Sequence, residues 1–344
     1  MIRAALAALM LALPWAGSAA ASDINYDILS FADLDGWQDD DHASALNVFA
    51  QTCQDMKGFD WRPLCALAQQ KPGAREFFEL FFRPVLISDG KPALFTGYFE
   101  PELNGALRPD SRFKYPLYRQ PPEARAQSPW LTRREIETGP VMKDRGLEIA
   151  WVDDPVELFF LQIQGSGRIR LTNGRTIRVG YGGKNGHEYS SIGAELVRRG
   201  TYNLHQVSAQ VIKNWVRRNP DAGAELLMHN DSYVFFRQID DLDPNHGPRG
   251  AMNRSITTGR SIAVDPAFIP LGAPVWIEKA GAEPVHRLMV AQDTGSAIKG
   301  AQRADLFMGT GDAAGRAAGT LRDAGRMLVL MPIQRAYAMA PDAM

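Results

Sequence analysis

Three aspartates in the last third of the chain each stand at the end of an apolar, strand-like run. Asp265 follows SIAV, Asp293 follows LMVAQ, and Asp305 begins DLFM. Strand ends are places where side chains from distant parts of a sequence can converge. Converging carboxylates repel, which raises the pKa of one of them and keeps it protonated near neutral pH, as a general acid requires. The alternative is that Asp265-Pro266 and Asp293-Thr294-Gly295 are ordinary turns, in which Asp side chains accept hydrogen bonds from backbone amides.

The Asp293-Thr294-Gly295 tripeptide also matches the catalytic segment of pepsin-like and retroviral proteases. Such a protease needs two aspartates that share a proton around one water. The sequence has no second Asp-Thr-Gly or Asp-Ser-Gly, so a protease would have to be a symmetric homodimer, and retroviral-type subunits are far smaller than 344 residues. A glycosidase, which usually uses two carboxylates at a set separation, is the other reaction class that fits.

Other common signatures of chemistry are missing. The sequence has no HExxH, GxSxG or Walker pattern, and its six histidines show no metal-ligand spacing, so we predict no metal and no cofactor. A formal net charge of −1 gives no indication of nucleic-acid binding. Aromatic and amide side chains of the kind that bind sugars do cluster in strand-like segments, although such residues more often belong to cores and strand ladders. These are Tyr98, Phe99, Gln162, Gln164, Tyr181, Asn185 and Tyr189.

The elements that must position these residues are mostly short strands. Hydrophobic periodicity, Gly and Pro predict helices over 39–54, 73–83, 191–199, 207–218 and 312–325. Runs rich in β-branched and aromatic residues predict strands, and their spacing in the last hundred residues favours a small barrel or sandwich. The predicted strands cover 85–90, 93–103, 157–164, 168–171, 176–179, 232–239, 261–265, 274–279, 286–293, 304–309 and 326–332.

The N-terminus has the pattern of a signal peptide. Ala4 to Trp15 is an apolar run that is shorter than the ~20 residues of a membrane span, and Ala19-Ala20-Ala21 is an acceptable cleavage site. The alternative is a buried N-terminal helix. Because no lipobox cysteine follows the run, we expect a soluble periplasmic protein without a lipid anchor, with residues 1–21 removed on export.

Cysteine usage agrees with export. Cys53 and Cys65, the only two cysteines, are twelve positions apart, which in an exported chain indicates one disulfide. Two buried free thiols are the alternative.

Long, ordered segments of the chain resemble the membrane-bound lytic murein transglycosylase A (MltA) family, and the C-terminal part resembles the three-aspartate (3D) domain of peptidoglycan-cleaving proteins. The resemblance covers about residues 90–335. It is carried by FTGYFEPEL (95–103), YPLYRQP (115–121), LTRREIE (131–137), WVDDPVELFFLQIQGSGRI (151–169), RVGYGGKNGHEYSSIG (178–193), NDSYVFFR (230–237), GRSIAVDPAFIPLGAPVWIE (259–278) and AQDTGSAIKGAQRADLFMGTGDAAG (291–315).

The resemblance implies a mainly β fold with some α: a double-psi β-barrel domain with a second, smaller β-barrel domain inserted and a deep groove between them. On this sequence the barrel domain would comprise 22–100 and 237–344, with the 3D domain at about 258–332, and the insertion 101–236. The implied activity is cleavage of the β-1,4 bond between N-acetylmuramic acid and N-acetylglucosamine without water, giving 1,6-anhydromuramoyl ends. The implied partner is the glycan strand of peptidoglycan, bound by a monomer. Association with murein synthases or hydrolases stays open.

The resemblance also implies roles for individual residues. Asp305 would be the single catalytic acid/base, with Asp293 and Asp265 supporting it in the same pocket. Thr96 and Tyr98 would lie near them, and Gln162, Gln164, Gly165 and Ser166 would face the groove from the insertion. A peptidoglycan-binding barrel without catalysis remains the alternative.

Overall fold

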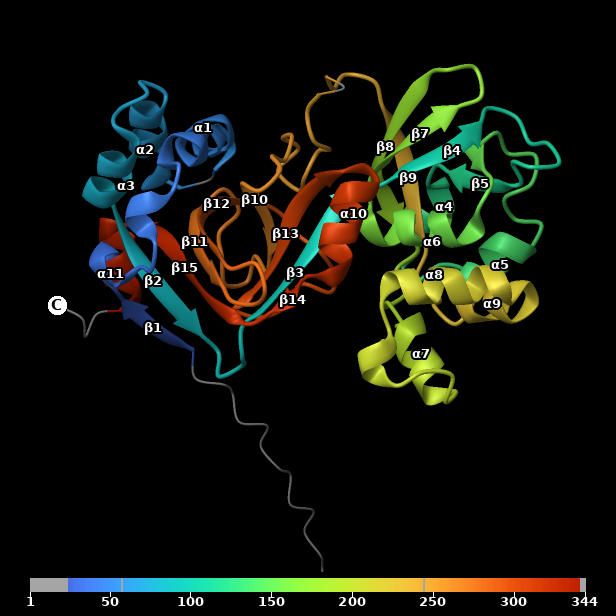
Figure 1. Cartoon of the computed structure of the whole chain (residues 1–344). Coiled ribbons are helices and arrows are strands. Elements are labelled where there is room, and N and C mark those ends of the chain that lie inside the picture. The colour runs from blue at the N-terminus through green and yellow to red at the C-terminus, as the bar shows by residue number, and fades with distance from the viewer. Residues whose placement is uncertain (1–23, 57, 244, 341–344) are drawn as a thin grey trace, which may run out of the picture.

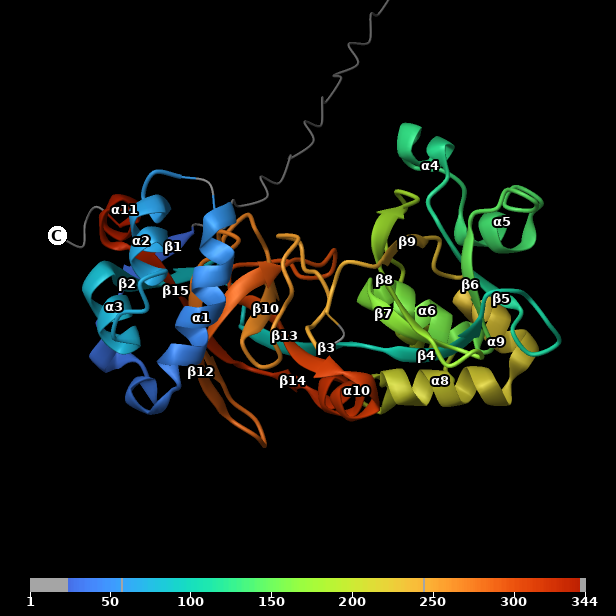
Figure 2. The same ribbon diagram turned by 90° about the horizontal axis from the view of Figure 1, so that it is seen from above.

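The computed structural model describes residues 24–56, 58–243 and 245–340, and the predicted signal peptide lies outside these ranges. Two β-sheets with flanking helices make up the described chain. The two sheets lie side by side in both ribbon views, and helices α1–α3 and α11 cover the outer end of the larger, nine-stranded sheet (Figures 1 and 2).

The larger sheet is mixed and has nine strands, in the order β1-β2-β15-β11-β12-β10-β13-β3-β14. Its strands come from both ends of the chain. Two of its pairs are parallel, β10 with β12 and β13 with β3. The strands are β1 (Asn25–Ile28), β2 (Phe82–Ser88), β3 (Leu94–Glu100), β10 (Ser261–Val264), β11 (Pro274–Lys279), β12 (Val285–Asp293), β13 (Arg303–Thr310), β14 (Arg322–Asp323) and β15 (Gly325–Pro332).

The second sheet has six strands, in the order β5-β6-β4-β7-β8-β9. Its first and last strands, β5 and β9, also contact each other, so the sheet is a nearly closed barrel. The predicted fold class, a mainly β protein in which a smaller barrel is inserted into a larger one, is confirmed. The strands are β4 (Glu102–Ala106), β5 (Tyr115–Tyr118), β6 (Glu148–Val152), β7 (Gly167–Leu171), β8 (Thr176–Lys184) and β9 (Val234–Ile239).

The helices are short and pack around the two sheets, and no helix among the described residues is long and apolar enough to cross a membrane. The α-helices are α1 (His42–Thr52), α2 (Trp61–Ala68), α3 (Ala74–Phe81), α4 (Pro122–Ala126), α5 (Arg133–Thr138), α6 (Pro155–Gln164), α7 (Ile192–Arg198), α8 (Ala209–Arg218), α9 (Pro220–Leu227), α10 (Gly311–Thr320) and α11 (Ile333–Met339). Short 3-10 helices are η1 (Phe31–Asp33), η2 (Trp37–Asp39), η3 (Cys53–Asp55) and η4 (Leu204–Gln206).

The strand predicted over 157–164 is wrong, because this segment is helix α6. Asp154 caps the helix by accepting the N–H groups of Val156 and Glu157, Pro155 occupies the first turn, and Gly165 ends it at a φ of 76°. The helix is buried on two sides. One side packs into the barrel core and the other packs against α7–α9. A helix covered on both sides shows no simple amphipathic period, so its aromatic and β-branched composition favoured a strand.

Other boundaries also differ from the prediction; the helix predicted over 312–325, for example, ends at Thr320, and Arg322–Asp323 is strand β14. A helix that was not predicted, α9, follows the one predicted over 207–218; Pro220 occupies its first turn, where the missing N–H costs nothing. The helix predicted over 73–83 ends at Phe81, and β2 already begins at Phe82. Helices α2, α4, α5 and α11 were not predicted either. They span only one or two turns, which is too short for a clear hydrophobic period.

Cys53 and Cys65 form the predicted disulfide, with an S–S distance of 2.02 Å. It joins η3 to α2 beside the aromatic core of the larger sheet, where Phe49 and Trp61 pack together. The bond therefore holds η3 and α2 together beside the core. Closing a loop of this length is expected to stabilise the fold by about 2–3 kcal/mol.

The chain crosses between the sheets at the end of β3, where Glu100 is fully buried. Its carboxylate contacts the Nε atoms of Arg168 and Arg178 at 2.9 Å each and accepts the hydroxyl proton of Thr310 at 2.9 Å. Both arginines also donate to the carbonyl of His246, on the segment that returns to the larger sheet. One buried carboxylate thus joins the outgoing strand, two strands of the barrel and the returning segment.

Candidate active site

Asp305 lies on β13 directly opposite Thr96 of the parallel neighbour β3. The Thr96 hydroxyl donates to Oδ1 of Asp305 at 2.7 Å, and the Arg303 guanidinium donates to that same hydroxyl oxygen at 2.8 Å. A guanidinium can only donate, so the single hydroxyl proton of Thr96 is directed to Asp305. Oδ1 is therefore an acceptor, and Oδ2 is the oxygen on which Asp305 can hold an acid proton.

Asp293 ends β12, two strands away from Asp305. Ala263 of β10 is the register partner of both aspartates, so the two carboxylates flank one methyl group. With strands ~4.8 Å apart, their Cα atoms are about 10 Å apart. Tyr98, which also faces this space from β3, donates its hydroxyl to Oδ2 of Asp293 at 3.1 Å. The small Ala263 side chain leaves room between the two acids.

Burial raises the pKa of both carboxyl groups. The pKa of Asp293 rises to about 6; the charge of Asp305 adds to this, while hydrogen bonds from Thr294, Tyr98 and Ala251 act against it. Burial is also the first cause of the raised pKa of Asp305, and the hydrogen bond from Thr96 and the charge of Arg303 act against it. The sequence argument placed carboxylate repulsion first; in the structure burial leads, and repulsion adds to the pKa of Asp293.

Tyr98 stays a neutral donor between the two acids. Burial, followed by the charges of Asp293 and Asp305, raises the pKa of its hydroxyl well above the usual value. Ala251 and Thr294 each donate a backbone N–H to Oδ1 of Asp293 at 2.9 Å. Asp293 is therefore held by three hydrogen bonds, whereas Oδ2 of Asp305 has no hydrogen-bond partner within the described part of the chain.

The third aspartate has different contacts from this pair. Asp265 follows β10, and its oxygens accept the N–H groups of Ala267 at 3.2 Å and of Gly300 at 3.0 Å. It does not belong to the residues that line the cavity around Asp293 and Asp305. These contacts are those of the turn that the sequence left as the alternative. A supporting role for Asp265 in the pocket stays a prediction.

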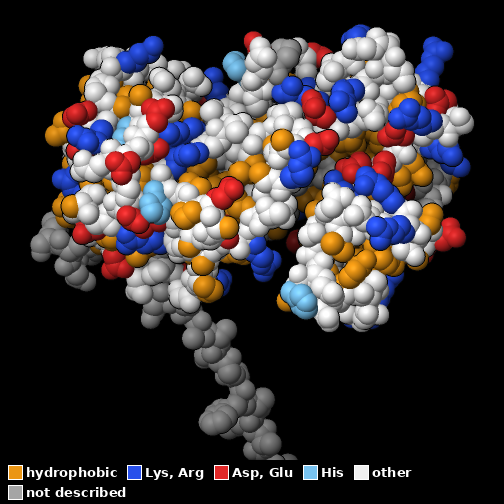
Figure 3. Space-filling model, in the orientation of Figure 1, with side chains coloured by type: hydrophobic (Ala, Val, Ile, Leu, Met, Phe, Trp, Pro, Cys, Tyr) orange, Lys and Arg blue, Asp and Glu red, His pale blue; other side chains and the backbone are white. Residues whose placement is uncertain are grey.

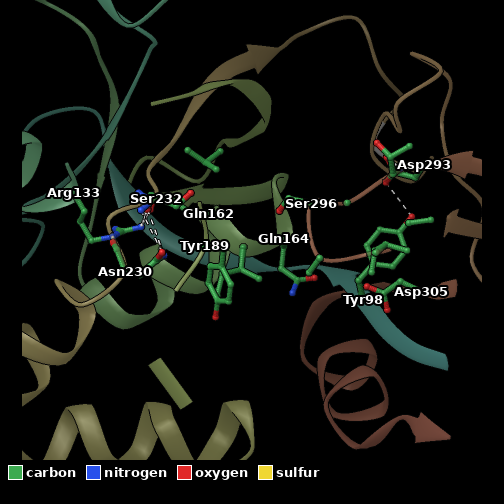
Figure 4. Close-up of a pocket in the computed structure, with 17 residues that line it drawn as sticks. Tyr98, Arg133, Gln162, Gln164, Tyr189, Asn230, Ser232, Asp293, Ser296 and Asp305 are labelled. Atoms are coloured by element: carbon green, nitrogen blue, oxygen red, sulfur yellow. Dashed lines mark hydrogen bonds between the residues drawn. The ribbon is translucent and has the colours of Figure 1, made fainter. Parts of the chain in front are cut away.

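The end of α6 brings the two glutamines to the same space, from a helix and not from a strand. Gln164 accepts the backbone N–H of Phe99 at 3.0 Å, which fixes the end of α6 beside Tyr98. Gln162 accepts from the buried Arg133, and its own amide nitrogen has no hydrogen-bond partner in the described residues. Figure 4 shows the acids at one end of the cavity, Arg133 and Gln162 at the other, and Gln164 and Ser296 between them.

A larger groove continues from this cavity between the two sheets, with a volume of about 560 Å³. Gly165 and Ser166 line it, as do Tyr181 and Tyr189, which are 52% and 42% exposed. In the space-filling view of one face, a notch at the lower edge separates the two halves of the molecule (Figure 3). Thr96 is not among the lining residues and lies behind Asp305. Asn185 is fully buried and bonded to backbone groups, so it does not reach the groove.

Sequence reasoning missed several of the lining or supporting residues. Arg303 precedes Asp305 by two positions and so shares its face of β13, a signal that strand period provides. Arg133 and Asn230 carry no such local signal, because they reach the cavity from separate loops and helices.

Comparison with known proteins agrees with this architecture. Residues 94–237 match the family described as the MltA specific insert domain, and residues 260–331 match the 3D domain. The membrane-bound lytic murein transglycosylase A of Vibrio cholerae is 34% identical over 264 residues, 72% of this chain and 69% of that protein. Its namesake in Escherichia coli K12 is 35% identical over 69% of this chain and 65% of that protein.

Solved structures agree as well. A membrane-bound lytic murein transglycosylase from Agrobacterium tumefaciens has a TM-score of 0.81 and 33% identity, covering 91% of this chain and 99% of that one. Escherichia coli MltA with bound chitohexaose has a TM-score of 0.71 and 28% identity, covering 85% and 89%. The matched part spans about two thirds of the curated relatives. The chain belongs to the membrane-bound lytic murein transglycosylase A family.

Proposed function

We propose that this protein is a peptidoglycan lytic transglycosylase that takes part in cell-wall turnover. It would cleave the β-1,4 bond between N-acetylmuramic acid and N-acetylglucosamine without water and leave a 1,6-anhydromuramoyl end. The observation that carries the proposal is the state of Asp305. It is a largely buried carboxyl group with a raised pKa and an oriented Oδ1, its Oδ2 has no hydrogen-bond partner among the described residues, and it lies at the wall of a groove between two sheets.

A single acid/base is enough for this reaction. Protonated Asp305 donates from Oδ2 to the glycosidic oxygen as the bond from that oxygen to C1 breaks. The C6 hydroxyl of the same muramoyl sugar then attacks C1, and its proton passes to the Asp305 carboxylate. The acid is regenerated, and because the nucleophile belongs to the substrate, no protein nucleophile and no water are needed.

Asp293 supports the cationic stage of the reaction in this scheme. Its pKa of about 6 leaves it mostly ionised near neutral pH, and it faces Asp305 across Ala263. A carboxylate held by three hydrogen bonds suits electrostatic stabilisation of charge that develops at C1. The N-acetyl oxygen of the substrate can contribute to the same stabilisation, as in substrate-assisted glycosidases.

The groove would hold the glycan strand. One side of the groove would be a barrel domain of residues 22–100 and 237–344, and the other an inserted domain of residues 101–236. Tyr98, Gln162 and Gln164, with Gly165 and Ser166, would contact the sugars. We further propose export to the periplasm, with residues 1–21 acting as the signal peptide. N-terminal sequencing of protein from a periplasmic fraction tests this cleavage directly.

The decisive experiment compares Asp305→Asn with wild type on purified sacculi. We expect the variant to lose at least about 100-fold in release of anhydromuropeptides, because it cannot supply the proton. Circular dichroism checks the fold, and Asp312→Asn, an exposed aspartate near the start of α10, is the matched control.

Mass spectrometry of the products separates the candidate functions, because anhydro ends are one water lighter than hydrolysed ends. Full activity of Asp305→Asn would rule out the mechanism. Sacculus binding without soluble products from wild type would favour a non-catalytic binding protein. Peptide cleavage blocked by pepstatin would favour the protease.

A further inference from the structure

The groove between the sheets is lined by more cations than carboxylates. Arg178, Lys184, Arg237 and Arg249 line it, against Glu188 and Asp293. Two of these cations already have partners, since Arg178 contacts the buried Glu100 and Arg249 contacts Asp241. Lys184 and Arg237 are exposed, and neither side chain has an ion pair or hydrogen bond with any described residue.

These two cations lie on neighbouring strands with an open floor between them. Arg237 of β9 is the register partner of Gly180, and Lys184 lies four positions further along β8. A bulge lies between Tyr181 and Gly183, so Lys184 pairs with Val234, three positions from Arg237 on β9; at ~3.3 Å per residue the two cations are about 10 Å apart along the strands. Glycines occupy three of the five positions between Arg178 and Lys184, so Tyr181 is the single large side chain that this stretch presents to the groove.

The sugar rings of a glycan strand offer these cations no charged partner. They present hydroxyl and N-acetyl groups, which are uncharged. On a muramoyl residue that carries a peptide, the lactyl carboxyl group is an amide and the negative charge comes from the carboxylates of the peptide; on a muramoyl residue without a peptide, the lactyl carboxylate itself is charged. A pair of free cations in a groove that would hold a glycan therefore points to the substituent of the muramoyl sugar.

We propose that Lys184 and Arg237 bind carboxylates of the peptide stem on the muramoyl residue, on either side of Tyr181. This inference rests on the proposed function. Exposed ion pairs contribute little each and are screened by salt, so the site would act on selectivity between stem-bearing strands and uncharged glycans more than on overall affinity. The protein would then favour stem-bearing peptidoglycan over uncharged glycans.

The test measures binding by the full chain carrying Asp305→Asn, so that turnover does not interfere. Two probes are titrated calorimetrically: a muramoyl tetrasaccharide with peptide stems, and neutral chitohexaose. Adding Lys184→Gln and Arg237→Gln should weaken binding of the stem-bearing probe about five- to tenfold at low salt. The loss should shrink at high salt, and the affinity for chitohexaose should stay within about twofold.

The control pair is Arg170→Gln with Arg175→Gln, which removes the same charge from exposed positions on the same barrel outside the groove. The proposal is supported if Lys184→Gln with Arg237→Gln weakens binding of the stem-bearing probe alone and the control pair does not weaken it. An equal loss of affinity for chitohexaose would overturn the proposal, because the cations would then contact the sugars. A loss of affinity for the stem-bearing probe no larger than in the control pair would also overturn it. If the parent bound neither probe, the proposed function and this inference would both be wrong.

Discussion

At the scale of residues, the behaviour of Asp305 is set by one chain of contacts, from Arg303 through Thr96 to Oδ1. All three residues lie on the pair β13 and β3. The sequence pointed to Asp305 and Thr96 through family resemblance, and strand period alone relates Arg303 to Asp305. The direction of the hydroxyl proton could not be predicted, because it depends on a register between segments about two hundred residues apart.

The hydrogen bond from Thr96 favours the ionised form of Asp305 and so lowers a pKa that burial raises. A general acid works only while protonated, so activity should fall as pH rises through this pKa. Thr96→Val removes the donor, and we expect the alkaline limb of the pH profile of kcat/KM to move to higher pH. The rate at the optimum should also fall, because Oδ1 loses the contact that orients the carboxyl group.

Thr96→Ser keeps the donor and should restore the alkaline limb to its wild-type position. A purely structural role for Thr96 would lower the rate in both variants without moving the limb. Anhydromuropeptide release from sacculi, followed across pH, provides the profile.

At the scale of elements, most strands of the larger sheet were predicted within a few residues, because each is a short apolar run bounded by Gly or Pro. Helix α6 was not, although Asp154, Pro155 and Gly165 are its start and stop signals. Because this helix is buried on two sides, its sequence is a nearly continuous apolar run, and hydrophobic periodicity could not distinguish a helix from a strand. The mistake matters for the site, since Gln162 and Gln164 project from the end of this helix.

We expect Asp154→Ala to destabilise the protein by about 1–2 kcal/mol. The side chain caps two N–H groups of α6 and also contacts Arg217, a partly exposed ion pair that adds less than the cap. Urea unfolding measures the change. Asp153→Ala is the matched control, because the Asp153 carboxylate contacts the exposed Arg112 and caps no helix. This variant should lose no more than about 0.5 kcal/mol of unfolding free energy. Equal losses in the two variants would contradict the capping role.

At the scale of the whole molecule, the groove depends on how two separately formed cores are held together. The clusters of the larger sheet and of the barrel share none of their buried hydrophobic residues. The chain passes between them twice, and Glu100 contacts or bridges both passages through Arg168 and Arg178. Sequence periodicity could not reveal this cluster, because its members come from four distant segments.

Glu100→Gln leaves two arginines facing each other in a site where the carboxylate is fully buried, so the variant should lose about 3 kcal/mol of unfolding free energy. The same contacts hold the returning segment at His246, so the width of the groove should become less defined in Glu100→Gln. We therefore expect its KM for glycan to rise more than its kcat falls. Glu102→Gln controls for the loss of charge, since Glu102 follows on β4, is partly exposed and has no ion pair within the described chain. Urea unfolding and sacculus kinetics on both variants decide the matter: if Glu100→Gln is as stable as Glu102→Gln, the buried cluster does not hold the two sheets together.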